Sequence, residues 1–117
     1  MMASPVVHFE IRSADPDATR AFYGKLFGWT YSEGGAPGYT FVDTGVEGAV
    51  PGAVSPLQGG DPLVTFFVGV GDVAATLDAA VAQGGRIVQP ATSVPGVTFG
   101  LLADPNGQVV GLASTGA

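Results

Sequence analysis

Three ionisable residues alternate along one short segment near the start of the chain. His8, Glu10 and Arg12 occupy every second position, with apolar residues between them. In a β-strand, side chains two residues apart project from the same face, about 7 Å from one another. Histidine can act as a general base near neutral pH, and a neighbouring glutamate can orient the ring or raise its pKa. We therefore take His8 and Glu10 as candidate catalytic residues and Arg12 as a candidate ligand-binding residue.

Two other interpretations of these side chains stay open. His8 and Glu10 could begin a metal site that a distant carboxylate, such as Asp43 or Glu47, completes. The three residues could instead form only a polar wall whose charges satisfy each other, because the chain has a single histidine and one histidine is not a catalytic constellation. A buried row of ionisable groups is nevertheless costly unless it is paired or used.

Other chemical motifs are weak or missing. Residues 69–74 match a G-x-G-x-x-A pattern, but Asp72 would put a negative charge where a pyrophosphate binds, and the ribose-binding carboxylate is missing. We read this segment as a plain strand-to-helix turn. The sequence contains no GxSxG elbow, P-loop or HExxH motif, and a Ser-His triad could be built only around His8.

Periodicity predicts the elements that position these residues. Alternating or apolar runs predict strands, and apolar residues at helical spacing after Asp15 and Asp72, with glycines at the far ends, predict two capped helices. The predicted strands are 6–12, 29–33, 38–44, 48–54, 63–70, 86–89, 96–103 and 108–113, and the predicted helices begin at Pro16 and Val73.

The two halves of the chain resemble each other. At a separation of 57 positions Phe9 matches Phe66, Asp15 matches Asp72 and Gly28 matches Gly85. We therefore predict a single α+β domain, 1–117, of two tandem βαβββ units, about 5–56 and 61–114. The expected architecture is a curved, half-open, eight-stranded mixed sheet around a cavity, with one helix per unit on the outside.

Strand parity also predicts the wall of that cavity. Thr65 and Phe67 share one face of their strand, and Tyr39 and Phe41 share one face of theirs. We expect these four residues, with Arg12, to contact a ligand. Such a lining suits a planar or apolar molecule, although aromatic stripes more often belong to a core.

Composition excludes several classes of function. Of the 117 residues, 46% are hydrophobic and 12% charged, with ten acidic and four scattered basic residues and a net charge of −6. A nucleic-acid or anionic membrane surface needs clustered Lys and Arg, so we expect neither partner. The absence of cysteine excludes disulfides and thiolate sites. Without a secretory signal or a long apolar run, a cytoplasmic location is expected.

The sequence resembles the vicinal oxygen chelate superfamily, which includes glyoxalases, bleomycin-resistance proteins and extradiol dioxygenases. The residues that carry the resemblance are His8-Phe9-Glu10-Ile11, Asp15, Ala18, Ala21-Phe22-Tyr23, Phe27-Gly28-Trp29 and Asp104-Pro105-Asn106-Gly107. The similarity spans essentially the whole chain. It implies the fold, but the superfamily hosts several activities on one scaffold.

The resemblance also implies where a metal ion would bind. Metal ligands of the superfamily fall by position at His8, at about Gly52, at Thr65 and at Gly111. Only His8 among them suits a metal, whereas a catalytic zinc ion needs three protein ligands. We therefore expect a metal-free domain without a cofactor that binds an unknown small organic ligand.

Two alternatives to simple binding remain. The chain could be a lyase, isomerase or dioxygenase of the same superfamily, with a non-standard metal ligand set or with His8 as a metal-free acid–base group. It could also be an interaction module whose cavity is vestigial. A homodimer is expected in any of these cases, because the superfamily often pairs subunits and the chain carries few charges.

Overall fold

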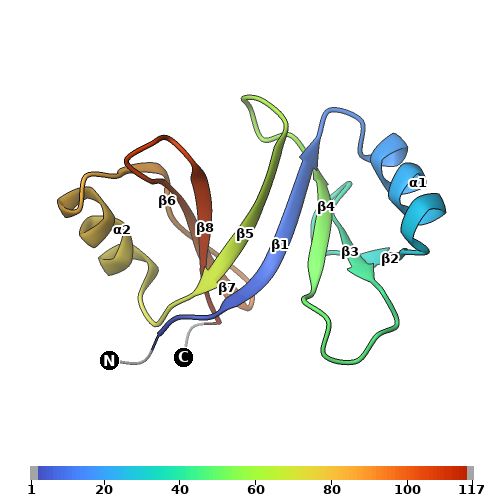
Figure 1. Ribbon diagram of the computed structural model, residues 1–117, viewed down its shortest axis with the longest axis horizontal. Coiled ribbons are helices and arrows are strands. Elements are labelled where there is room, and N and C mark those ends of the chain that lie inside the picture. Colours follow the sequence, from blue (N-terminus) through green and yellow to red (C-terminus); the bar gives the residue numbers. More distant parts are fainter. Residues whose placement is uncertain (1–2, 116–117) are drawn as a thin grey trace. The chain divides into compact units, whose positions relative to one another are not determined.

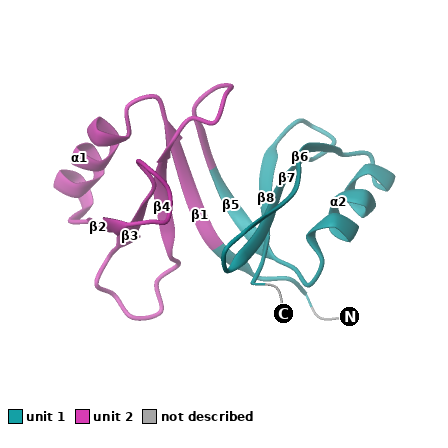
Figure 2. Ribbon diagram, turned by 180° about the vertical axis from the view of Figure 1, so that it is seen from behind, with its two compact units in different colours: residues 1–7, 65–117 teal, residues 8–64 magenta. Residues whose placement is uncertain are grey.

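The computed structural model describes residues 3–115, which form eight strands and two helices (Figure 1). They divide into two compact units (Figure 2). Unit 2 comprises residues 8–64. Unit 1 comprises the residues up to Val7 together with those from Thr65 onward.

Unit 2 is a four-stranded mixed sheet with one helix. Its strand order is β2-β3-β4-β1, in which β4 runs parallel to β1 and antiparallel to β3. Its elements are β1 (Val6–Ser13, of which the first two residues belong to unit 1), α1 (Pro16–Phe27), β2 (Thr30–Glu33), β3 (Thr40–Asp43) and β4 (Gly52–Pro56).

Unit 1 repeats the same plan. Its strand order is β5-β8-β7-β6, with β5 parallel to β8 and the other pairs antiparallel. Its elements are β5 (Leu63–Gly69, whose first two residues belong to unit 2), α2 (Val73–Ala82), β6 (Arg86–Val94), β7 (Val97–Ala103) and β8 (Val109–Ser114). The α+β fold of eight strands and two helices in βαβββ order is confirmed. Closure around a cavity concerns how the units meet and stays a prediction.

The helix boundaries follow the predicted caps. The Asp15 side chain accepts a hydrogen bond from the Ala18 N–H, at 3.1 Å, and Asp72 accepts one from the Ala75 N–H, at 3.0 Å. These carboxylates satisfy N–H groups that have no partner within the helix. Gly28 ends α1 with a φ of 74°, a conformation that favours glycine.

Each helix covers an apolar core of its own unit. In unit 2 the buried side chains of Ile11, Val42 and Val54 pack with four aromatic rings, those of Phe9, Tyr23, Trp29 and Tyr31. In unit 1 the core residues are Val73, Leu77 and Leu112. Within residues 3–115, neither helix has the length and apolar character needed to cross a membrane.

Two strands differ from their predicted ranges by four residues or more. β4 begins at Gly52 rather than at residue 48, because Gly45 and Gly48 adopt positive φ and the Ala49 N–H donates to the Val46 carbonyl, which makes the preceding segment a turn. β6 continues to Val94 although Pro90 lacks an N–H donor. Register shifts on either side of Gln89 accommodate the proline, as β-bulges do.

Two glycines lie directly under phenylalanine rings. A Cβ atom on Gly52 would lie 2.2 Å from the Phe9 ring, and one on Gly111 would lie 2.4 Å from the Phe67 ring. Each glycine is the cross-strand neighbour of the phenylalanine that covers it. The missing side chain therefore makes room for the ring.

This close packing predicts the effect of a single methyl group. Gly52→Ala should lower the free energy of unfolding by about 1–3 kcal/mol, the usual range for overpacking. Gly35→Ala is the control, because no atom lies within 4 Å of its Cβ position, and it should change stability by less than about 0.5 kcal/mol. Urea unfolding of both variants measures the difference. Equal stabilities would show that the Phe9 ring is not fixed over Gly52.

Candidate functional site

One face of the unit 2 sheet is polar, and β1 supplies most of it. Phe9 and Ile11 belong to the core under α1, so His8, Glu10 and Arg12 project from the opposite face. Glu10 and Arg12 are nevertheless buried, with 5% and 8% of their side chains exposed. The sheet therefore holds an acid and a base out of water on the face that the helix does not cover.

Glu10 is the centre of this polar face. Its Oε2 accepts a hydrogen bond from the Arg12 Nε–H at 2.7 Å, and its Oε1 accepts one from the Tyr39 hydroxyl at 3.1 Å. The His8 Nε2 atom lies 3.7 Å from Oε1 and 3.5 Å from the Tyr39 oxygen. The structure thus brings together four residues that were predicted from β1 and from the 38–44 strand.

The contacts of Glu10 decide its protonation. Burial alone would raise the pKa of Glu10, but the contacts with His8 and Arg12, the Arg12 charge and the Tyr39 hydroxyl outweigh this effect and bring the pKa below its ordinary value. Burial and the charge of Glu10 together raise the pKa of Tyr39 far above its ordinary value. At neutral pH a protonated Tyr39 therefore donates to an ionised Glu10.

His8 is the most exposed of the three ionisable residues on β1, at 21% of its side chain. Its Nε2 lies near both an acceptor, Glu10, and a hydroxyl, Tyr39. A carboxylate beside an imidazole ring is the arrangement that orients a histidine for proton transfer. The geometry can therefore support an acid–base role for His8, with Glu10 as its orienting partner.

The other residues predicted to contact a ligand are Phe41, in unit 2, and Thr65 and Phe67, in unit 1. Phe41 is 45% exposed, and its ring stands edge-on to the Tyr39 ring, with centroids 5.5 Å apart. In unit 1 the Thr65 hydroxyl donates to the Val109 carbonyl at 2.7 Å, and the buried Phe67 ring covers Gly111. Thr65 and Phe67 are thus engaged within their own unit, whereas Tyr39 and Phe41 extend the polar face of β1.

Ser55 is a residue of this face that the sequence analysis missed. It is the cross-strand neighbour of Arg12, and none of its surface is exposed. Within residues 3–115 its hydroxyl has no hydrogen-bond partner. The signal was the alternation of β4, where Ala53 and Ser55 occupy the face opposite the core residue Val54.

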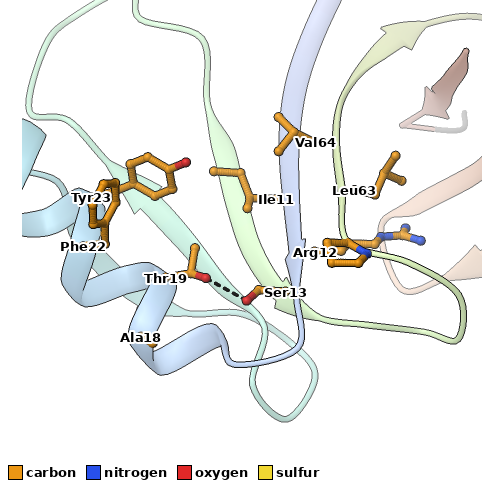
Figure 3. Close-up of a pocket in the computed structure, with 10 residues that line it drawn as sticks. Ile11, Arg12, Ser13, Ala18, Thr19, Phe22, Tyr23, Leu63 and Val64 are labelled. Atoms are coloured by element: carbon orange, nitrogen blue, oxygen red, sulfur yellow. Dashed lines mark hydrogen bonds between the residues drawn. The ribbon is translucent and has the colours of Figure 1, made fainter.

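A groove of about 390 Å³ borders the end of β1 (Figure 3). It is lined by residues 11–13, by the α1 residues Ala18, Thr19, Phe22 and Tyr23, and by residues 62–64. Figure 3 shows the Arg12 side chain on one side of β1 and those of Ile11 and Ser13 on the other. On the side of Ile11 and Ser13, the Thr19 hydroxyl donates a hydrogen bond to the Ser13 oxygen. Arg12 belongs to the lining of this groove, but its side chain is directed to the polar face on the other side of β1.

The positions at which the superfamily places metal ligands do not fit a metal ion. Gly52 and Gly111 have no side chain, and phenylalanine rings fill the space where one would start. The Thr65 hydroxyl is directed at a backbone carbonyl. His8 alone retains a metal-binding side chain.

The structure does not assemble the off-pattern metal site either. Among residues 3–115, no three His, Asp or Glu side chains gather into a group that could hold a metal ion. Asp43, one of the carboxylates considered from the sequence, is exposed and accepts a hydrogen bond from the Gly45 N–H at 2.8 Å. It therefore caps a turn instead of joining His8 and Glu10.

Comparison of the sequence with known proteins identifies a family and several relatives. Residues 6–112 match the sequence pattern of the Glyoxalase/Bleomycin resistance protein/Dioxygenase superfamily. CFP32 of Mycobacterium bovis and of Mycobacterium tuberculosis, named provisionally as a glyoxylase, is 29% identical over 88% of this chain. The chain spans 42% of the length of these curated relatives.

Solved structures share the fold at low identity. A glyoxalase/bleomycin resistance protein/dioxygenase superfamily member from Vibrio splendidus superposes with a TM-score of 0.63 at 14% identity, over 96% of this chain and 99% of its own. Methylmalonyl-CoA epimerase from Mycobacterium tuberculosis also gives 0.63, at 17% identity, over 97% and 92%. These likenesses extend the agreement on fold to 96–97% of the chain.

The lowered pKa of Glu10 predicts a pH-dependent contribution to stability. In the unfolded chain the carboxyl has a pKa near 4.3, so the unfolded state takes up a proton first as the pH falls. The stability that Glu10 provides is therefore present above about pH 4.3 and is lost as the pH falls through the folded pKa. At pH 7, Glu10→Gln should destabilise by about 3 kcal/mol, because it leaves Arg12 buried without its carboxylate.

Urea unfolding at pH 7 and below pH 4 checks this sign. The difference between wild type and Glu10→Gln should shrink at the lower pH, and Glu33→Gln, at an exposed position of β2, should change little at either. A difference that stays constant between the two pH values would contradict an ionised, paired Glu10.

Proposed function

This chain belongs to the glyoxalase/bleomycin resistance protein/dioxygenase superfamily, and we propose that it binds a small organic molecule on the polar face of unit 2, without a metal ion. His8, Glu10, Arg12 and Tyr39 form the polar part of the site, and Phe41 adds an exposed aromatic surface. Thr65 and Phe67 of unit 1 are kept as proposed ligand contacts from the sequence.

The observation that carries the proposal is the buried charge on the uncovered face of the sheet. Removing Glu10 and Arg12 from water costs several kcal/mol per ion, and a well-packed apolar pair would serve stability as well or better. Tyr39 and Arg12 donate hydrogen bonds to both oxygens of Glu10, which fixes the orientation of the cluster. Preorganised polar groups beside an aromatic wall are typical of a ligand site.

The donor set supports the metal-free part of the proposal. Two of the four superfamily ligand positions are glycines under aromatic rings, and both oxygens of Glu10 already accept hydrogen bonds. A zinc or other divalent ion would need to displace these contacts and would gain one imidazole. A metal-dependent lyase, isomerase or dioxygenase with a non-standard ligand set remains the alternative outcome of the test below.

Catalysis is a second candidate, favoured by the position of His8. Its Nε2 stands 3.7 Å from the ionised Glu10, and that pairing suits an acid–base group acting on a bound molecule without a metal. CFP32, which carries a glyoxylase name, is the relative that encourages this reading. Because the chain spans under half the length of that protein, its activity enters only as a proposal here.

The proposal is tested on protein purified without a histidine tag. Thermal unfolding against a library of small organic molecules should find compounds that stabilise wild type, because a ligand at a hundred times its Kd adds about 2.7 kcal/mol. His8→Gln should weaken that stabilisation. Glu47→Gln, in the exposed turn before β4, is the matched control and should keep it.

Metal content is measured on the same preparations by mass spectrometry. We expect less than stoichiometric zinc, iron, manganese or nickel in wild type. One equivalent of any of these ions that disappears in His8→Ala would overturn the metal-free assignment. Two results of the ligand screen would contradict a site on the polar face. One is that no compound stabilises wild type, and the other is that the compounds stabilise His8→Gln as much as wild type.

A homodimer and a cytoplasmic location complete the proposal as expectations from sequence. Sedimentation velocity of the tag-free protein should give the mass of two 11.7 kDa chains. A single monomeric species across micromolar concentrations would contradict the dimer.

A further inference from the structure

On the polar face of unit 2, both carboxylate oxygens of Glu10 already accept hydrogen bonds, whereas some donor groups have no acceptor. Both oxygens of Glu10 receive hydrogen bonds, one from the Arg12 Nε–H and one from Tyr39. The two terminal nitrogens of Arg12 take no part in any hydrogen bond within residues 3–115. A guanidinium carries four further N–H groups on these nitrogens, arranged as a planar fork. A molecule that satisfies this face must therefore bring acceptor atoms.

Ser55 adds an independent donor at the same place. It is paired in register with Arg12 on the neighbouring strand, and parallel strands lie about 4.8 Å apart. Its fully buried hydroxyl has no partner in the described chain. An unpaired buried hydroxyl is unfavourable, so a group that accepts a hydrogen bond from Ser55 would relieve a deficit already present in the protein.

We propose that the terminal nitrogens of Arg12 and the hydroxyl of Ser55 form a subsite for the carboxylate of a small organic acid. This inference rests on the proposed function, because it names the chemical class of the ligand at that face. Carboxylate oxygens match the guanidinium fork in a bidentate geometry, and the hydroxyl supplies a further donor.

Charge favours a carboxylate over a phosphate. Arg12 already shares its positive charge with the ionised Glu10, 2.7 Å away. A dianionic phosphate would bring two further negative charges next to that carboxylate, whereas an organic acid brings one.

The apolar remainder of such an acid would contact Phe41, whose ring is exposed beside Tyr39. An aromatic acid therefore suits the face better than a bare anion does.

Access depends on Arg12 itself. Ser55 has no exposed surface, so an acid can reach its hydroxyl only after a neighbouring side chain moves. Arg12 is the long, flexible side chain next to Ser55 in register. We expect the guanidinium to shift on binding while its Nε–H keeps the contact with Glu10.

The test compares acids with their neutral amides in the intact protein. Benzoate and phenylacetate, and the corresponding benzamide and phenylacetamide, are titrated into nitrogen-15-labelled wild type and followed by NMR at the Arg12 Nε–H and at the backbone signals of His8, Tyr39 and Ser55. The acids should bind at least tenfold more tightly than the amides. Ser55→Ala should weaken the acids about tenfold, the loss expected for one hydrogen bond to a charged group.

Ser55→Ala removes an unpaired hydroxyl, so it should unfold at the same temperature as wild type or a higher one, which separates lost binding from lost folding. Ser32→Ala, at an exposed position of β2, is the matched control and should bind the acids as wild type does. Equal affinity for acids and amides at these signals would overturn the carboxylate subsite and leave the proposed ligand site standing. Unchanged acid binding by Ser55→Ala would overturn the role of Ser55. If neither acids nor amides move these signals, the subsite falls, and the proposed function then depends on the library screen alone.

Discussion

The burial of one carboxylate governs the polar face of unit 2. Glu10 lies on a strand whose other face belongs to an apolar core, so it cannot turn away without breaking the alternation of β1. Its charge persists in a dry environment because Arg12, Tyr39 and His8 surround it. Each of these partners is in turn held by the same carboxylate. The cluster therefore behaves as one preorganised unit, in which removing any member exposes the others to an unfavourable setting.

Two glycine–phenylalanine contacts shape the packing of the strands at positions where the resemblance places metal ligands. At Gly52 and Gly111 a ring from the neighbouring strand occupies the space of a side chain. Aromatic rings that cover glycines restore packing across a sheet that would otherwise contain a gap. A side chain at either glycine would need the ring over it to move, and at Gly52 it would start on the core face with Phe9, opposite His8.

Local signals in the sequence were sufficient for most of the fold. Asp15 and Asp72 cap the helices as expected, and the alternation of residues 6–12 places the core and polar faces of β1 correctly. The predicted strand boundaries were wrong where they depended on backbone dihedral angles, which the residue types alone do not determine. Gly48 was placed at the start of the predicted strand 48–54, and its positive φ in the folded chain assigns it to the preceding turn. The strand predicted over 86–89 was likewise too short, because bulges carry β6 past Pro90.

By itself the sequence determined the βαβββ repeat, the capped helices and the row of His8, Glu10 and Arg12. These follow from the similarity of the two halves, from the capping aspartates and from side-chain periods of two and 3.6 residues. Tertiary structure alone decided which partners that row would have. Tyr39 reaches Glu10 across 29 residues of sequence, and Ser55 faces Arg12 only because β4 pairs with β1 in one particular register. Register depends on packing between strands distant in sequence, and a shift of one residue would send Ser55 to the core face and leave Arg12 opposite another side chain.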